Sequence, residues 1–210
     1  MALTPANPLD PDDHHDSAQR LSPRVEREVL FETNRLQLVR AIPADIPHFV
    51  AIYCSQEMMA HLGRPFSEDQ AASRIDTWNQ QWSELGWGGG VVVDKATSVS
   101  IGTAKLILTK LPDYIGSHEV GYMVLPQHQG KCFASEIAAG AVRYLFERVR
   151  AQRVVADVHP DNGPSNRVLE KLGFLDQGVK NYTQPDFAGY DRQRIWLLPQ
   201  EKWEADNTNK

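Results

Sequence analysis

The fold is decided by the stretch Gln127-His-Gln-Gly-Lys-Cys-Phe-Ala134, which joins an apolar strand ending at Pro126 to an amphipathic helix. A strand that runs through a short glycine-bearing loop into a helix leaves several backbone N–H groups unpaired and directed at one point. The dipole of the helix favours an anion at the same point. The pattern therefore predicts a phosphate-binding loop at the start of this helix.

A second informative segment is Asn162-Gly-Pro-Ser-Asn-Arg-Val-Leu-Glu-Lys-Leu-Gly-Phe174. It follows a β-branched run over residues 153–159, which indicates a strand. Pro164 stands where the first turn of a helix is expected and Gly173 stands just past its end, the usual asymmetry of helix termini. The segment therefore predicts a short helix over residues 164–172.

The remaining chain alternates between patterns of two-residue and three- to four-residue period. We expect an α/β (α+β) fold with a mixed, mostly antiparallel central sheet of about seven strands and helices on both faces. The expected strands cover residues 35–41, 87–94, 98–108, 119–125, 153–159, 175–183 and 190–198. The expected helices begin near residues 43, 67, 130 and 164. Trp78, Trp82 and Trp87 are interpreted as core residues rather than as a groove.

Composition limits the class of protein. Residues 1–24 and 204–210 lack apolar periodicity and are predicted to be disordered tails around a single domain over residues 25–203. The net charge of −5 argues against a nucleic-acid partner, and no stretch is long enough to cross a membrane. Cys54 and Cys132 have no metal or redox spacing, so we expect reduced thiols, a cytoplasmic protein and no metal.

The order of elements, with the loop at residues 129–136 and the segment at 162–174, resembles the GNAT superfamily of acetyl-CoA-dependent N-acetyltransferases. The resemblance spans roughly residues 31–198, and the chain looks most like the branch that includes the bacterial ribosomal-protein N-terminal acetyltransferases. It implies a transferase that binds acetyl-CoA and an amine acceptor, which is either a small molecule or a protein N-terminus. It also implies a monomer or a homodimer.

The resemblance carries over residue by residue. It implies that pyrophosphate is held by the backbone amides of six residues, namely Gln129, Gly130, Lys131, Cys132, Phe133 and Ala134. The pantetheine arm would run along Met123, Val124 and Leu125 and would contact Asn162. Two positions depart from the family pattern. Cys132 stands where a second small residue is usual, and Leu169 stands where many relatives have a tyrosine that protonates the leaving thiolate. Ser165 then becomes the candidate proton donor and a further cofactor contact.

Transfer of an acetyl group to an amine requires a base near the amine. Glu119 lies on the strand before the loop and shares a face with Gly121 and Met123, so we expect it to be that base. The alternative for Glu119 is a solvated strand residue. An α-amine is the easier acceptor, because its pKa near 7.7–8.0 leaves roughly a tenth of it neutral at pH 7, far more than a lysine near 10.4. Two other functions stay open, a transferase of a longer acyl group and a non-catalytic acyl-CoA sensor.

Overall fold

The computed structural model describes residues 27–182 and 191–208. The strands are β1 (Val29–Glu32), β2 (Leu36–Val39), β3 (Gly90–Asp94), β4 (Ser100–Leu108), β5 (His118–Val124), β6 (Arg153–Val158), β7 (Leu175–Asn181) and β8 (Arg192–Pro199). The α-helices are α1 (Ile46–Tyr53), α2 (Gln56–Met59), α3 (Glu68–Leu85), α4 (Phe133–Tyr144), α5 (Gly163–Lys171) and α6 (Gln200–Thr208). Short 3-10 turns at Pro43–Asp45, Pro112–Tyr114 and Pro126–His128 and a π-helical turn at Leu145–Val149 complete the order.

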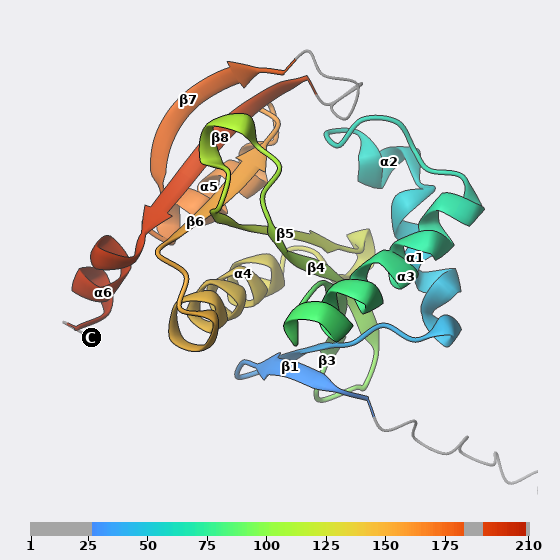
Figure 1. Cartoon of the computed structure of the whole chain (residues 1–210). Coiled ribbons are helices and arrows are strands. Elements are labelled where there is room, and N and C mark those ends of the chain that lie inside the picture. Colours follow the sequence, from blue (N-terminus) through green and yellow to red (C-terminus); the bar gives the residue numbers. More distant parts are fainter. Residues whose placement is uncertain (1–26, 183–190, 209–210) are drawn as a thin grey trace, which may run out of the picture.

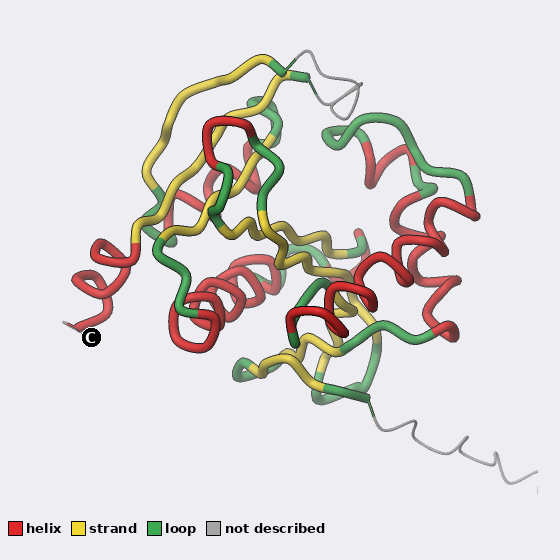
Figure 2. Tube along the Cα trace, viewed as in Figure 1, coloured by secondary structure: helices red, strands yellow, loops and turns green. Residues whose placement is uncertain are grey.

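The strands form one sheet in the order β1-β2-β3-β4-β5-β6-β8-β7. Every neighbouring pair is antiparallel except β5 and β6, which are parallel. Helices α1 to α3 lie on one side of the central strands β4 and β5, and α4 lies on the other (Figures 1 and 2). The mixed, mostly antiparallel sheet with helices on both faces confirms the fold expected from the sequence.

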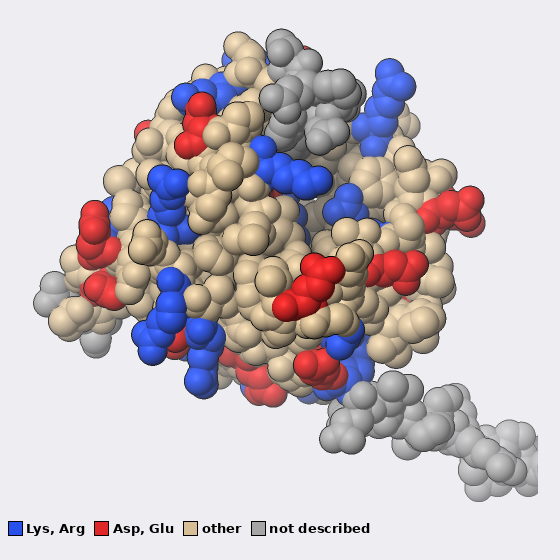
Figure 3. All heavy atoms as spheres, in the orientation of Figure 1, with Lys and Arg blue, Asp and Glu red and all other residues tan. Residues whose placement is uncertain are grey.

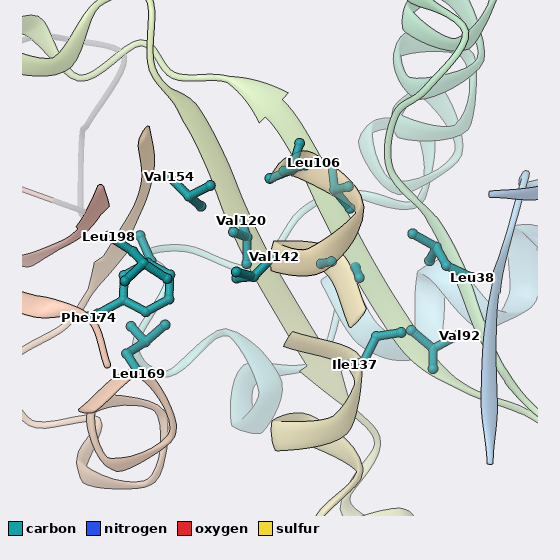
Figure 4. Close-up of a cluster of buried hydrophobic side chains, with 14 of the residues drawn as sticks. Leu38, Val92, Leu106, Val120, Ile137, Val142, Val154, Leu169, Phe174 and Leu198 are labelled. Carbon is teal, nitrogen blue, oxygen red and sulfur yellow. The ribbon is translucent and has the colours of Figure 1, made fainter. Parts of the chain in front are cut away.

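Two apolar clusters show which side chains of β4 and β5 point to each side of the sheet. Leu106 and Val120 point toward α4 and pack in one cluster with Ile137 and Val142 (Figure 4). A second cluster joins valines of β3 to buried aromatic residues of α1 and α3, including Phe49 and Trp78. Since side chains alternate along a strand, the residues of β4 and β5 between the apolar ones must face α1 and α3. This face carries the polar side chains described below.

Helix α3 illustrates how the sequence dictates local structure. The Ser67 hydroxyl accepts a hydrogen bond from the Gln70 N–H, and the Gln70 side-chain oxygen accepts one from the Ser67 N–H, so both bonds of a capping box are present. The helix ends at Gly86, whose φ of +75° suits glycine. Trp78 and Trp82 are buried on its inner face, so the interpretation of these tryptophans as core residues is confirmed.

The structure also differs from the expectation at several places, one of which is the short helix α2, which the sequence analysis did not predict. Strand β1 was missed, because its side chains are only partly buried and give no clear alternation. Helix α4 begins at Phe133 rather than at Gly130, because Gly130 and Cys132 both have positive φ. The predicted tail after residue 203 is helical as far as Thr208, since α6 continues directly from β8. The predicted N-terminal tail at 1–24 lies outside the described residues.

No helix in residues 27–182 and 191–208 combines the length and the apolar character needed to span a membrane.

Candidate active site

The site begins where two neighbouring strands separate. The parallel strands β5 and β6 pair only at His118 with Val154 and at Glu119 with Val155. Beyond Glu119, no strand of the described residues pairs with the edge of β5 that faces β6, and the opening leads into a cavity of about 1180 Å³. The cavity reaches both faces of the sheet, because its lining includes residues of α1 and α3 as well as residues of α5. A ligand threaded between β5 and β6 would therefore meet a second ligand from the opposite face.

The loop before α4 forms one end of this cavity. The backbone N–H groups of Gly130 through Ser135, a run of six amides, donate no hydrogen bond to any described residue. Gly130 has a φ of +75° and open space where a Cβ would stand, and Cys132 adopts a φ of +61°. These left-handed positions turn successive amides toward one side, which is the geometry of an anion-binding nest. The loop can therefore hold a pyrophosphate.

Gln129 has a different part in this loop from its neighbours. Its backbone N–H donates to the Pro126 carbonyl at 3.1 Å, and its side-chain Nε2 donates to the Val124 carbonyl at 2.9 Å. These bonds fasten the loop to the end of β5. The free run of amides consequently starts one residue later than expected, at Gly130.

The other predicted cofactor contacts divide into two groups. Met123, Val124 and Ala134 line the cavity, and Phe133 lines it while packing its side chain in the core. Leu125 and Lys131 do not line it. The Leu125 N–H donates to the Ile101 carbonyl on the β4 side, and the Lys131 side chain is exposed.

Helix α5 brings two polar residues to the opening. The Asn162 side-chain oxygen caps the helix by accepting from the Ser165 N–H at 3.2 Å, while its amide nitrogen donates to no described residue. Asn166 anchors the turn, since its amide donates to the carbonyls of His159, Pro160 and Asn162. Asn162 and Ser165 both line the cavity, so the structure brings them together with the loop before α4.

Tyr122 is a residue that the sequence analysis missed. Its hydroxyl is buried beside the Ser165 side chain, yet no hydrogen bond of ordinary geometry joins it to any described residue. Burial raises the pKa of Tyr122, and the neighbouring Ser165 only partly opposes that effect, so the hydroxyl is protonated at neutral pH. Two hydroxyls that can donate a proton therefore lie side by side in the wall of the cavity.

Glu119 lies on the opposite face, at the base of the cavity. Its side chain is only 4% exposed, so the alternative of a solvated strand residue is wrong. One carboxylate oxygen accepts from Lys105 Nζ and the other accepts from Thr109 Oγ1 at 2.7 Å. Asp157 Oδ1 lies 4.0 Å from the same Lys105 nitrogen. This cluster places two carboxylates and one cation where the cavity meets β4, β5 and β6.

The charges of this cluster fix its protonation. Burial alone would raise the pKa of Glu119, but the Lys105 charge and the hydrogen bonds from Lys105 and Thr109 outweigh it and lower that pKa. Burial alone would lower the pKa of Lys105, but Glu119 and Asp157 reverse the effect and raise it. Glu119 is thus ionised and Lys105 protonated at neutral pH. Lys105 was missed in the sequence, where a lone lysine in the apolar run of β4 was the available signal.

The comparisons with known proteins decide the family. A family model described as an acetyltransferase (GNAT) domain matches residues 35–175. The chain belongs to the GNAT acetyltransferase family. It is 31% identical to the uncharacterized N-acetyltransferase YoaA of Bacillus subtilis, over 77% of this chain and 92% of that protein. It is 33% identical to the uncharacterized N-acetyltransferase p20 of Bacillus licheniformis, over 83% of this chain and 98% of that protein.

Solved structures agree on the fold of this GNAT protein. A GNAT acetyltransferase from Bacillus anthracis superposes with a TM-score of 0.67 at 19% identity, covering 81% of this chain and 98% of that one. A ribosomal-protein-S5-alanine acetyltransferase from Vibrio fischeri gives a TM-score of 0.63 at 19% identity, covering 82% and 97%. At such identities the likeness concerns the fold alone. Acetyltransferases of this family use acetyl-CoA as co-substrate.

Alkylation of Cys132 gives a direct check on the loop. We expect iodoacetamide to label Cys132 faster than Cys54, because Cys132 is exposed, whereas desolvation and the Glu68 charge raise the pKa of the half-buried Cys54 thiol. Saturating acetyl-CoA should protect Cys132, since a pyrophosphate on the neighbouring amides covers the loop. Peptide mass spectrometry after brief alkylation measures both rates. Equal labelling of Cys132 with and without bound acetyl-CoA would contradict the placement of the phosphates.

Proposed function

We propose that this GNAT acetyltransferase transfers the acetyl group of acetyl-CoA to a primary amine, either a protein N-terminal α-amine or a small amine. The observation that carries the proposal is the opening between β5 and β6, which joins a run of six free amides on one side to the Glu119 cluster on the other. The names of the Bacillus relatives support an amine acceptor. The Vibrio fischeri neighbour is named for an alanine of ribosomal protein S5. Both cysteines are free, which agrees with a reducing compartment such as the cytoplasm.

The residues fit acetyl-CoA as follows. The amides of Gly130 to Ala134 hold the pyrophosphate, with Lys131 and Cys132 as neighbouring side chains. Met123 and Val124 lie along the free edge of β5, and the unused Asn162 amide can donate to a carbonyl of the pantetheine arm. Gln129 and Leu125 support this edge through their bonds to Val124 and Ile101. When bound, acetyl-CoA supplies a thioester whose carbonyl carbon is the electrophile.

The protein groups then move two protons. As the C–N bond forms and the C–S bond breaks, the acceptor nitrogen loses a proton and the leaving sulfur needs one. The ionised Glu119 carboxylate accepts the first proton, directly or through one water, since each of its oxygens keeps a lone pair beyond the bonds to Lys105 and Thr109. The hydroxyls of Ser165 and Tyr122 supply the second proton. Because the lowered pKa of Glu119 makes it a weak base, an acceptor of low pKa such as an α-amine is favoured.

Substitution of Gly130 tests the proposed cofactor site. In the wild type, acetyl-CoA at about a hundred times its Kd should raise the melting temperature by roughly 5–10 °C. Gly130→Val should abolish this shift, because a β-branched residue strongly disfavours a φ of +75° and its side chain would occupy the approach to the amides. Differential scanning fluorimetry with and without acetyl-CoA measures the shift.

Gly116→Val is the matched control for this experiment. Gly116 also has a positive φ, +84°, with open space around its missing Cβ, but it does not line the cavity. This variant should lose a similar amount of stability, about 1–3 kcal/mol, yet keep the full acetyl-CoA shift. A full shift in Gly130→Val would place the phosphates elsewhere and remove the support for the proposed function.

Removal of the Ser165 hydroxyl should slow the chemical step. Ser165→Ala is expected to lower kcat about 10- to 100-fold, with a larger fall when it is combined with Tyr122→Phe, because both proton donors are then gone. Helix α5 should stay intact, since its cap is the Asn162 side chain and not the serine hydroxyl. Steady-state kinetics together with thermal melts separate the two effects. A stability loss without a loss of kcat would show that Ser165 is a structural residue.

A further inference from the structure

Arg74 lies in the wall of the cavity and is a cation without a counter-charge among the described residues. It projects from α3 and lines the cavity, and its guanidinium carbon lies 4.9 Å from the ring centres of Tyr53 and Phe66 and 5.9 Å from that of Trp78. Its Nε is buried and has no hydrogen-bond partner in the part of the chain that the structure describes. Within the described ranges, no carboxylate forms an ion pair with it.

The three aromatic rings orient this guanidinium but do not neutralise it. A cation over aromatic faces is stabilised by the quadrupoles of the rings and keeps its full charge. The planar guanidinium keeps its donors in a rigid fork, which matches the two oxygens of a carboxylate. Arg74 is therefore oriented in advance for an anion that the described protein does not supply.

Other basic side chains add to the positive charge near Arg74. Arg64 and Lys110 line the same cavity, and both are exposed and form no ion pair within the described part of the chain. On the face drawn in Figure 3, lysine and arginine side chains gather around a hollow, although the whole chain carries a net charge of −5. Three carboxylates of described residues line the cavity. Glu119 and Asp157 both lie beside Lys105, the second at 4.0 Å, and Glu57 is exposed at the rim.

Arg74 lies on the side of the sheet where the acceptor would bind, and not on the side of the amides proposed for the cofactor. Helix α3 packs on the sheet face that carries Lys105 and Glu119, whereas the amides proposed for pyrophosphate lead into α4 on the other face. Tyr53, which packs against Arg74, is anchored to the same polar face through Thr103 Oγ1 at 3.2 Å. An anion at Arg74 would thus lie on the side from which the amine approaches.

We propose that Arg74 binds a carboxylate of the acceptor, so that the preferred acceptor is a primary amine that also carries a carboxylate. This inference rests on the proposed function and names the substrate class of that site. Glu119 and Asp157 face the amine at the base of the cavity, and Arg74 holds the carboxylate at its α3 wall. The carboxylate can belong to a free amino acid or to an acidic side chain near a protein N-terminus.

Two acceptor pairs separate these sources. The first pair is a free amino acid and its amide, compared at equal concentrations of neutral amine. The second pair is two peptides that differ only by Glu or Gln at the second position. The wild type should favour the carboxylate-bearing member of one pair by about 10- to 100-fold in kcat/KM, expressed mainly in KM. The pair that shows the preference identifies the source of the carboxylate.

Variants of Arg74 test whether this residue produces the preference. Arg74→Met keeps the apolar stem against the rings and should reduce the preference to below about threefold. Arg74→Lys keeps the charge without the fork and should retain an intermediate preference. The control Arg64→Met changes an exposed arginine of the same cavity and should alter the preference by less than about threefold. Thermal melts and acetyl-CoA affinity are measured for each variant.

The outcomes distinguish this inference from the proposed function. If the wild type acetylates no amine, the proposed function fails. If it acetylates amines with no preference in either pair, only the Arg74 inference fails. Three results would each overturn the Arg74 inference. The first is an equal loss of kcat/KM for both members of the preferred pair in Arg74→Met, and the second is weakened acetyl-CoA binding in that variant. The third is an equal loss of preference in Arg64→Met. Should Arg74→Met not fold, the intermediate preference of Arg74→Lys decides.

Discussion

Glu119→Gln is expected to lower kcat by about 10²- to 10⁴-fold at neutral pH, while acetyl-CoA binding changes little. The reason is that the amide cannot accept the proton that the acceptor amine loses. Glu119 is positioned for this proton by Lys105 and by Thr109 at 2.7 Å, so the substitution leaves the shape of the site intact. Steady-state kinetics with an α-amine acceptor, combined with calorimetric titration of acetyl-CoA, measure both quantities.

Glu57→Gln is the matched control for this result. Glu57 lines the same cavity and undergoes the same chemical change, but its side chain is exposed and lies on α2. It should change kcat by less than about threefold, because an exposed charge is largely screened. A fall of less than tenfold in Glu119→Gln, or an equal fall in both variants, would reduce Glu119 to a positioning residue.

Lys105→Met is expected to destabilise the protein by about 3–5 kcal/mol, because it leaves the buried Glu119 carboxylate without its cation. For a domain of this size the loss corresponds to a fall in melting temperature of roughly 10 °C. Lys95→Met removes a partly exposed lysine paired with Glu32 and should shift the melting temperature by less than about 2 °C. Thermal melts of the three proteins test the comparison.

The double variant Lys105→Met/Glu119→Gln should recover part of the lost stability, since neither member of the pair then leaves the other as an uncompensated charge.

The stabilisation by the Lys105–Glu119 pair should also depend on pH. Glu119 has a lowered pKa in the folded protein, so its stabilisation is present above the unfolded value near 4.5 and is lost as the pH falls through the folded value. Lys105 has a raised pKa, so its stabilisation persists below 10.5 and is lost as the pH rises through the folded value. If the difference in stability between wild type and Lys105→Met stayed unchanged as the pH fell into the acid range, this result would contradict the ion pair.

The loop from Gln127 to Ala134 could be recognised in the sequence because its physics is local. A glycine between a strand and a helix implies free amides, and the structure has them from Gly130 onward. The two-residue period of β5 likewise predicted the face on which Glu119 lies. Such inferences need only neighbouring residues, which explains why they could be made without a structure.

The partners of Glu119 depend on information that a single strand does not contain. Lys105 reaches it because β4 and β5 pair in a register that sets Lys105 opposite Gly121, where the missing side chain leaves room for the lysine stem. In the two-residue pattern of β5, Tyr122 falls at a position typical of a core residue. It meets Ser165 only because β5 and β6 separate after two paired residues. Registers and strand separations arise from tertiary packing, so these residues appeared only in the structure.

The most direct test of the central claim is a coupled measurement of products from acetyl-CoA and a panel of amines. Free thiol and acetylated amine are quantified in the same reaction, the first by a thiol-reactive chromophore and the second by mass spectrometry. The proposed function predicts equal amounts of both products, at a rate that rises with the amine and falls in Glu119→Gln. Acetyl-CoA binding that raises the melting temperature without thiol release or acetylated amine for any acceptor would contradict catalysis and favour an acyl-CoA sensor.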